Sequence, residues 1–245
     1  MTKKHTRFWE IDFLRGIAIV FMIFYHFLID MYHFGLPHPE LTTGVLMYGQ
    51  KLSASIFLFL VGVSLTLSYS RASAKRKNLF RKYLWRGLKV FSWGFVLTVT
   101  TWIFYRHNFI IFGILHLIGV AIILAYPFLR YRVLNLVLGA VLIVFGAWLG
   151  RLTFGFRWLI WLGFRPENFY YLDYFPILPW FGVVLLGIFA GNTLYKDHVR
   201  RFKFWNVENT RFVRFFKFLG VHSFFIYLIH QPVLIFLLYA AGFSL

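Results

Sequence analysis

The residues with the clearest chemical meaning are an arginine and a histidine, Arg15 and His26, in the first long apolar stretch of the sequence. At about 100° per residue on a helix, eleven steps return both side chains to nearly the same face, about 16 Å apart along the axis. Charged side chains inside a bilayer cost at least ~2.5 kcal/mol and usually face a protein interior or a wet cavity. The spacing therefore predicts a polar track, with a cationic anchor near one membrane face and a titratable imidazole deep in the bilayer.

Two carboxylates share this predicted helix face. Asp12 precedes Arg15 by three residues and can pair with it. Asp30 follows His26 by four residues, where it can accept a hydrogen bond from one ring nitrogen and leave the other nitrogen as a base. With no serine or cysteine nucleophile next to this pair, it predicts general-base chemistry on a substrate hydroxyl or amine. The structural alternative is that Arg15 extends to the interface and His26 bonds a neighbouring helix.

Further polar residues lie within later apolar stretches. His116 lies in the fourth of these stretches, and Tyr227, His230 and Gln231 lie in the last. Tyr227 precedes His230 by three residues and shares its helix face. Together with His26 they can line one substrate-binding cavity, although each alone is also typical of a hydrogen bond between helices.

Metal ligation is not expected. The sequence contains no cysteine, which excludes disulfides, a thiol nucleophile and a thiolate metal site. His33, His38 and Glu40 are metal-ligand types, but their spacing matches no helix or turn site for a metal.

The composition defines the elements that must position these residues. With 60% hydrophobic residues and a mean hydropathy of +0.70, the chain is too apolar for a water-soluble domain of 245 residues. It is predicted to be an all-α polytopic membrane protein whose first apolar stretch is retained rather than cleaved. We place seven spans at about 8–30, 44–70, 86–105, 109–129, 133–150, 177–195 and 218–243.

The net charge of +18 is explained by topology rather than by nucleic acid. If the N-terminus is cytoplasmic, most of the 26 Lys and Arg residues fall in cytoplasmic segments, as the positive-inside rule requires. An odd number of spans then places the C-terminus outside, and a multi-pass protein of the plasma membrane is expected. Anionic lipid accounts for much of the remaining basic character.

The chain is predicted to form one membrane domain, residues 1–245, without internal repeats. Two basic, aromatic connections, about 71–89 and 196–217, are predicted to be amphipathic helices on the inner leaflet. Their cations can alternatively hold a polyphosphate ligand. The outer aromatic segment, about 151–176, is predicted to be interfacial or re-entrant, and its rings with Asp173 can bind a sugar or form an ordinary aromatic belt.

The segment LRGIAIVFMIFYH resembles the R-x10-H motif of transmembrane acyltransferases, including the acyltransferase-3 proteins. The surrounding sequence is more similar to bacterial relatives of heparan-α-glucosaminide N-acetyltransferase. The resemblance covers nearly the whole chain and is carried, in order, by WEIDFLRGIAIV, FGILHLIGVAIIL, DYFPILPWFGVVLLGIFAG and LGVHSFFIYLIHQPVLI. The motif alone is weakly specific, whereas four ordered segments in one seven-span frame are a strong signal.

This resemblance implies transfer of an acetyl or other acyl group from cytoplasmic acyl-coenzyme A to an extracytoplasmic sugar or glycan. It implies that His26 is the catalytic residue and that Arg15 helps to bind the donor. We expect Arg86, Arg200 and Arg201 to contribute to donor binding, because coenzyme A is a polyanion, and Asp12 to contribute by pairing with Arg15. A homo-oligomer is compatible with the sequence.

Two other functions remain open at this stage. A transporter or flippase of an anionic lipid-linked sugar can use the same polar track, although no inverted repeat is visible. A b-type haem protein can use the intramembrane histidines as axial ligands, but that function gives no role to Arg15. The acceptor, the acyl chain, and the choice between direct transfer and an acyl-histidine intermediate are not determined by the sequence.

Overall fold

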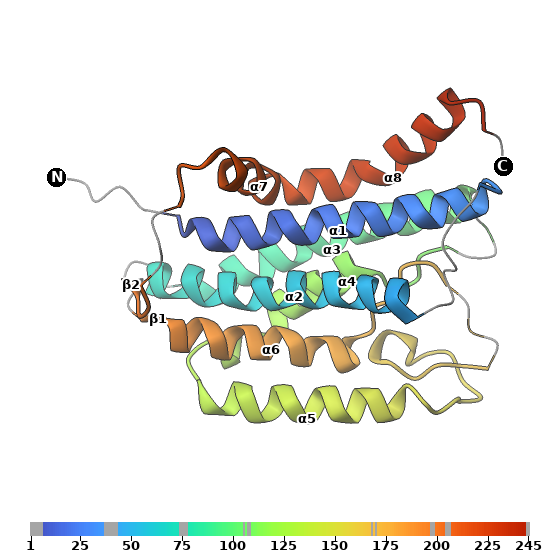
Figure 1. Cartoon of the computed structure of the whole chain (residues 1–245). Helices are drawn as coiled ribbons and strands as arrows, with labels where there is room; N and C mark the ends of the chain where they lie inside the picture. Colours follow the sequence, from blue (N-terminus) through green and yellow to red (C-terminus); the bar gives the residue numbers. More distant parts are fainter. Residues whose placement is uncertain are drawn as a thin grey trace. The chain divides into compact units, whose positions relative to one another are not determined.

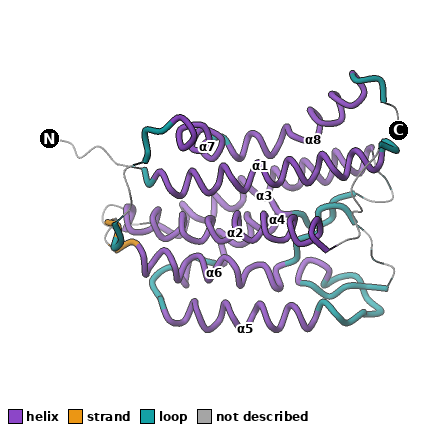
Figure 2. Tube along the Cα trace, in the orientation of Figure 1, coloured by secondary structure: helices purple, strands orange, loops and turns teal. Residues whose placement is uncertain are grey.

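The computed structural model describes residues 7–36, 44–73, 78–104, 106, 109–167, 169, 171–196, 199–203 and 207–243. These residues are nearly all helical, and strand is confined to one short antiparallel pair (Figure 2). The prediction of an all-α membrane protein is therefore confirmed. The elements are α1 Trp9–His33, α2 Gly44–Ser73, α3 Leu79–Phe104, α4 Ile114–Leu124, η1 Tyr126–Phe128, α5 Val133–Leu149, η2 Ile160–Leu162, α6 Ile177–Leu194, β1 Tyr195–Lys196, β2 Val199–Arg200, α7 Arg211–Val221 and α8 Ser223–Ala240.

Each of the seven apolar stretches forms a helix near its predicted position. Among the described residues, five helices are long and apolar enough to cross a membrane, namely α1, α2, α3, α6 and α8. The remaining two, α4 and α5, have 11 and 17 residues and are shorter than a usual span. α4 is extended by the turn at Ala125 and by η1.

The chain divides into two compact units within α2. Unit 1 contains Met1–Leu60 and Phe204–Leu245, and unit 2 contains Val61–Lys203. In unit 1, α8 runs alongside α1 and bends along its length (Figure 1). Pro232 lies inside α8, where it removes a backbone donor and favours such a bend.

α1 and α7 approach each other unusually closely in unit 1. A side chain at Gly16 would overlap the backbone oxygen of Phe216, and one at Gly220 would overlap that of Asp12. Glycine at both positions therefore allows the two backbones to come into direct contact. This crossing lies beside Asp12 and Arg15, so it helps to fix the N-terminal end of the predicted polar face.

Helix directions in unit 2 alternate along the chain. α3 runs antiparallel to α4, since Gly94 lies against His116 and Gly87 against Gly119. α5 and α6 are also antiparallel, with Gly139 against Gly182 and Gly146 against Pro179. α6 runs parallel to the C-terminal part of α2, where Gly62 meets Val184 and Thr66 meets Gly191. This alternation is the pattern expected if every apolar helix reverses the direction of the chain.

Large apolar side chains cover much of the helix surface. Phe24, Phe95 and Phe236 are 55%, 59% and 68% exposed. So many exposed large apolar side chains are rare on proteins in water, and they suit contact with lipid tails. The surface agrees with a multi-pass membrane protein.

The basic connections differ from the prediction in one respect. Residues 79–89 are the first turns of α3, and no separate amphipathic helix forms there, because the apolar pattern continues without a break into the span. The second connection contains β2 and α7, and α7 is a separate helix whose first turn is capped by the Thr210 hydroxyl. The segment predicted to be the outer one, about 151–176, is mostly irregular in its described residues, with η2 as a helical turn.

Candidate functional site

The predicted catalytic face of α1 meets α8 in unit 1. The rings of His26 on α1 and His230 on α8 lie with centroids 4.9 Å apart. Nearer the C-terminal ends of the two helices, Phe34 contacts Tyr239. The two contacts occur in the same order along both helices, so α1 and α8 are parallel. One face of α8 therefore follows the polar face of α1.

Asp30 is bound by α8 rather than by its neighbour on α1. Its Oδ1 atom accepts a hydrogen bond of 2.6 Å from Nε2 of Gln231, and its Oδ2 atom has no partner among the described residues. The expected hydrogen bond between Asp30 and His26 is therefore not formed. Helical spacing allows that contact, but the amide of the packed helix supplies a donor that the sequence on α1 alone does not reveal.

The orientation of Gln231 follows from this bond. A carboxylate oxygen accepts hydrogen bonds, so the amide nitrogen must face Asp30 and the amide oxygen must point elsewhere. That oxygen, Oε1, is buried and has no partner in the described part of the chain. The side chain thus joins the two helices while keeping one free acceptor.

His230 is also held in a defined state. Its Nδ1 atom lies 2.6 Å from the backbone oxygen of Tyr227, which only accepts hydrogen bonds, so Nδ1 carries the proton. In the neutral ring, Nε2 then has a lone pair. This nitrogen is buried and makes no hydrogen bond to the residues that the structure describes. The Tyr227 ring lies beside it, with centroids 5.5 Å apart.

Three unpartnered polar atoms therefore belong to one cluster, which we call the acceptor cluster: Asp30 Oδ2, His230 Nε2 and Gln231 Oε1. All three accept hydrogen bonds in the states just derived. Unpaired buried polar groups are costly, so such a cluster indicates a bound group that donates hydrogen bonds. A hydroxyl or an amine has this property, whereas a phosphate does not.

His26 borders this cluster and is half-buried. Its ring packs edge-on against Tyr25 and is tilted against His230. An imidazole that is partly exposed beside these acceptors can reach a group bound to them, which a general base requires. The structure thus brings together His26, Asp30, Tyr227, His230 and Gln231, five of the predicted site residues.

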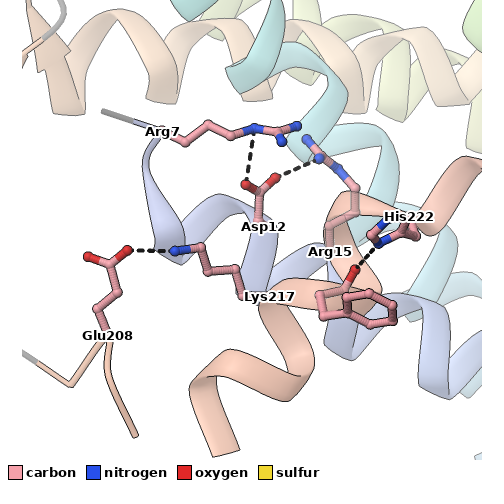
Figure 3. A network of polar contacts seen from close by, with 7 residues as sticks. Arg7, Asp12, Arg15, Glu208, Lys217 and His222 are labelled. Atoms are coloured by element: carbon pink, nitrogen blue, oxygen red, sulfur yellow. Dashed lines mark hydrogen bonds and ion pairs between the residues drawn. The ribbon is translucent and has the colours of Figure 1, made fainter. Parts of the chain in front are cut away.

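Arg15 and Asp12 form a separate ion-pair group near the start of α1 (Figure 3). Arg15 Nη1 donates to Asp12 Oδ1 at 3.0 Å, as the spacing predicted. Arg7 approaches the other carboxylate oxygen, with Nε 3.4 Å from Oδ2. One buried carboxylate therefore lies between two cations, and the group keeps a net positive charge that suits a ligand phosphate. The contribution of Arg7 was not predicted from the sequence.

The other predicted donor-binding cations are in unit 2. Arg86 is exposed on α3, Arg200 is half-buried on β2, and Arg201 is exposed just after β2. Arg201 joins this hairpin to α6 through a backbone hydrogen bond from its N–H to the Leu194 oxygen. Their role in donor binding stays a prediction.

His116 and Asp173 meet at the start of α4 in unit 2. His116 Nδ1 accepts from the N–H of Gly113, and Nε2 lies 3.4 Å from the hydroxyl of Thr98. Asp173 Oδ2 accepts from the N–H of Ile114, which places a carboxylate at the positive end of α4. His116 is 3% exposed and stacks on Phe112. These contacts give both side chains a structural task, and a role in substrate binding stays a prediction.

The outer segment is anchored by Tyr174, whose hydroxyl donates to the Ile160 oxygen at 2.7 Å. Burial raises the pKa of Tyr174 to about 12, which outweighs the opposing effect of nearby Arg165. The phenol therefore remains a neutral donor.

No group of three potential metal ligands occurs among the described residues. His33 lies within them, and its Nδ1 bonds the Ile29 oxygen, whereas His38 and Glu40 lie outside the described residues.

Comparison with known proteins gives one match. A family model described as heparan-alpha-glucosaminide N-acetyltransferase, catalytic, matches residues 7–232. No curated protein and no solved structure matches the chain. The matched range begins at Arg7 and ends at Pro232, so it includes both the ion-pair group of α1 and the whole acceptor cluster.

Proposed function

The chain belongs to the family of heparan-alpha-glucosaminide N-acetyltransferase catalytic domains, and on that basis we propose the reaction that it performs. The protein transfers an acetyl or other short acyl group from cytoplasmic acyl-coenzyme A to a hydroxyl or amine of an extracytoplasmic sugar. Family membership supports a membrane acetyltransferase with an acetyl-coenzyme A donor and a sugar acceptor. Since the match runs through both units, we propose that residues 1–245 act as one catalytic domain.

The acceptor cluster is the observation that carries the proposal. Its three unpartnered atoms need hydrogen-bond donors, and a sugar hydroxyl or amine provides them. Acyl-coenzyme A offers acceptors at its thioester carbonyl and its phosphates, so those parts of the donor do not complement the cluster. The cluster therefore favours the sugar, and its position beside His26 brings the reacting hydroxyl or amine to a base.

The proposed reaction begins when His26 removes a proton from the acceptor hydroxyl or amine. The oxygen or nitrogen then attacks the thioester carbonyl carbon, and the carbon–sulfur bond breaks. The proton held by His26 passes to the leaving thiolate, which restores the neutral imidazole. Asp30, Gln231 and His230 hold the acceptor so that its reacting atom faces the thioester, and this positioning contributes through proximity.

The donor end of the site is assigned to Arg15. Its guanidinium donates to phosphate oxygens more readily than a neutral group, and its pairing with buried Asp12 fixes its position. Arg7 adds a second charge at the same carboxylate. The eleven-residue spacing along α1 separates this anchor from His26 by about 16 Å, a length that suits an extended pantetheine arm.

An assay with the full chain in proteoliposomes tests the reaction. Acetyl-coenzyme A is supplied on one side, a panel of amino sugars and neutral sugars on the other, and free coenzyme A thiol is measured with time. We expect thiol release that depends on the presence of an acceptor. Failure of the purified protein to bind any acyl-coenzyme A, or release that ignores the acceptor, contradicts the proposal.

The mechanism has a competing form in which His26 itself carries the acyl group. Rapid mixing with acetyl-coenzyme A in the absence of acceptor distinguishes the two. Direct transfer predicts no burst, whereas an acyl-histidine intermediate predicts one equivalent of thiol per protein before steady turnover.

The orientation with the N-terminus in the cytoplasm is part of the proposal, because it places the basic connections on the donor side. Because the sequence contains no cysteine, a cysteine introduced at one position is the thiol that a maleimide labels, and this makes the orientation testable. In intact cells, a membrane-impermeant maleimide is expected to label Gly155→Cys, in the outer segment, but to label Asn209→Cys only after permeabilisation. Labelling in the reverse pattern overturns the orientation without affecting the chemistry.

A further inference from the structure

A second polar region lies at one end of unit 2, apart from the residues assigned to catalysis. It is formed by the end of α2, the start of α3, η1 with the residues that follow it, and the end of α6 with its hairpin. Hydrogen bonds join these parts: Lys82 to Ser68, Arg130 to Tyr69, and Asn192 to the Leu129 oxygen. The region is therefore built by contacts between four segments that are distant in sequence.

The charged side chains of this region, among the residues that the structure describes, are cations. Its described segments, residues 68–73, 78–86, 126–132, 192–196 and 199–203, contain no carboxylate side chain. Their cations include Arg71, Lys82, Arg86, Arg130, Arg200 and Arg201. Cations gathered in one region repel one another, so an anionic ligand stabilises them.

Three tyrosines, Tyr69, Tyr83 and Tyr126, pack together beside these cations. The Tyr126 ring contacts the rings of Tyr69 and Tyr83, with centroids 6.5 Å and 5.6 Å away. Arg130 donates from Nε to the hydroxyl oxygen of Tyr69 at 2.6 Å and lies over its ring. The Tyr69 hydroxyl thus accepts from a cation, and its own proton remains available for donation.

Tyr83 supplies the most specific sign of a ligand. Its side chain is fully buried, and its hydroxyl, which has Ser68 beside it, makes no hydrogen bond of normal geometry to the residues described. Ser68 lies close by, and its hydroxyl accepts from Lys82, whose ammonium lies 5.5 Å from the centre of the Tyr83 ring. A phenol without a partner, placed beside cations, is a donor for an anion.

We propose that this region, which we call the tyrosine–cation cluster, binds a phosphate group. Tyr83, Tyr69, Lys82 and Arg130 supply the donors, and Arg86 adds charge. A phosphate offers several acceptor oxygens with negative charge, so it complements a set of groups that can only donate or are already cationic. The cluster is a binding site and takes no part in bond making.

Two sources of the phosphate are chemically equivalent at this site. One is the polyphosphate of a soluble acyl donor, and this source rests on the proposed function. The other is the headgroup of an anionic phospholipid in the same leaflet. The binding proposal requires only the phosphate chemistry, and the experiment separates the sources.

The test uses purified full-length protein and four variants: Tyr83→Phe, Arg130→Gln, and the matched controls Tyr171→Phe and Arg157→Gln, which lie in the outer segment. The soluble probes are pyrophosphate and adenosine 3′,5′-bisphosphate, and binding is followed by thermal stabilisation in neutral detergent. The lipid probe is a nanodisc containing phosphatidylglycerol, compared with one of phosphatidylcholine alone. We expect one probe class to stabilise the wild type and the controls, and to bind about tenfold or more weakly to both cluster variants.

Tyr83→Phe also tests the role of the hydroxyl without a folding artefact. Removing an unpartnered buried hydroxyl leaves the ligand-free protein as stable as the wild type or more stable. Loss of phosphate binding with unchanged ligand-free stability therefore supports the site. The proposal is overturned if neither probe class stabilises the wild type, or if the cluster variants respond like the controls. Because no turnover is measured, this failure is distinct from a failure of acyl transfer.

Discussion

The acceptor cluster of unit 1 and the tyrosine–cation cluster of unit 2 differ in the kind of hydrogen-bonding group that they contain. In unit 1, the unpartnered atoms are an oxygen of Asp30, an oxygen of Gln231 and a nitrogen of His230, all of them acceptors. In unit 2, the polar groups are donors: the hydroxyl of Tyr83, and the cations Lys82 and Arg130, which bond Ser68 and Tyr69. The first suits a sugar hydroxyl or amine, and the second suits a phosphate.

The difference shows that hydrogen-bonding character separates the two kinds of ligand better than polarity does. Both clusters contain buried polar groups at helix contacts, and both would be called polar by composition alone. The state of each group, fixed by its neighbours, determines what it can bind. The following changes test this contrast, from the largest expected effect to the smallest.

His26→Ala is expected to have the largest effect, because it removes the proposed base that borders the acceptor cluster. Acyl transfer should fall by about 10²–10⁴-fold, while binding of acetyl-coenzyme A is preserved. Thiol release and donor binding are measured on the same preparation. His222→Ala is the matched control, since this exposed histidine bonds the Phe218 oxygen of the neighbouring helix turn. Retention of most transfer by the His26 variant would remove it from the mechanism.

Asp30→Asn sharpens the comparison by replacing one acceptor of the cluster with a group that can also donate. We expect the KM for the acceptor sugar to rise by about ten- to a hundredfold, with unchanged donor binding, because a carboxylate hydrogen bond is lost. The double variant Asp30→Asn with Gln231→Glu exchanges the two groups and restores a bond between α1 and α8. Recovery of folding without recovery of acceptor binding would identify the carboxylate on α1 as the essential group.

Gly220→Ala tests whether the contact between α1 and α7 holds the ion-pair group in place. The added methyl group would overlap the backbone oxygen of Asp12, so the helices must separate. We expect a loss of stability of about 1–3 kcal/mol in thermal unfolding, with weaker donor binding. Gly49→Ala is the control, because nothing lies within 4 Å of its added atom and alanine favours a helix. Equal melting temperatures for the two variants would show that the close contact is not required.

Glu208→Gln should have the smallest effect. Glu208 pairs with Lys217 at 2.6 Å, and both side chains are substantially exposed (Figure 3). Solvent screening limits such a pair to about 0.2–1 kcal/mol, and adding salt should reduce its effect further. A larger loss of stability or of transfer would show that this exposed pair belongs to a functional site after all.

The sequence by itself determined the fold class and the helix positions, because long apolar stretches can cover their surface only in a bilayer and can satisfy their backbone only as helices. It also determined the pair of Asp12 with Arg15, since a spacing of three residues brings both onto one helix face. For the same reason it placed His26 and Asp30 on a shared face. These conclusions depend on local periodicity, which needs no knowledge of neighbouring helices.

Only the tertiary structure decided which groups those faces meet. Gln231 binds Asp30 across 201 residues of sequence, and Arg130 binds Tyr69 across 61. Such contacts depend on helix direction, packing distance and rotation, and close crossings such as Gly220 on Asp12 set them. Tyr83 was not predicted as a site residue, and only packing showed that its hydroxyl is buried beside Lys82. Local spacing therefore defined the reactive residues, and helix packing defined whether each one accepts or donates.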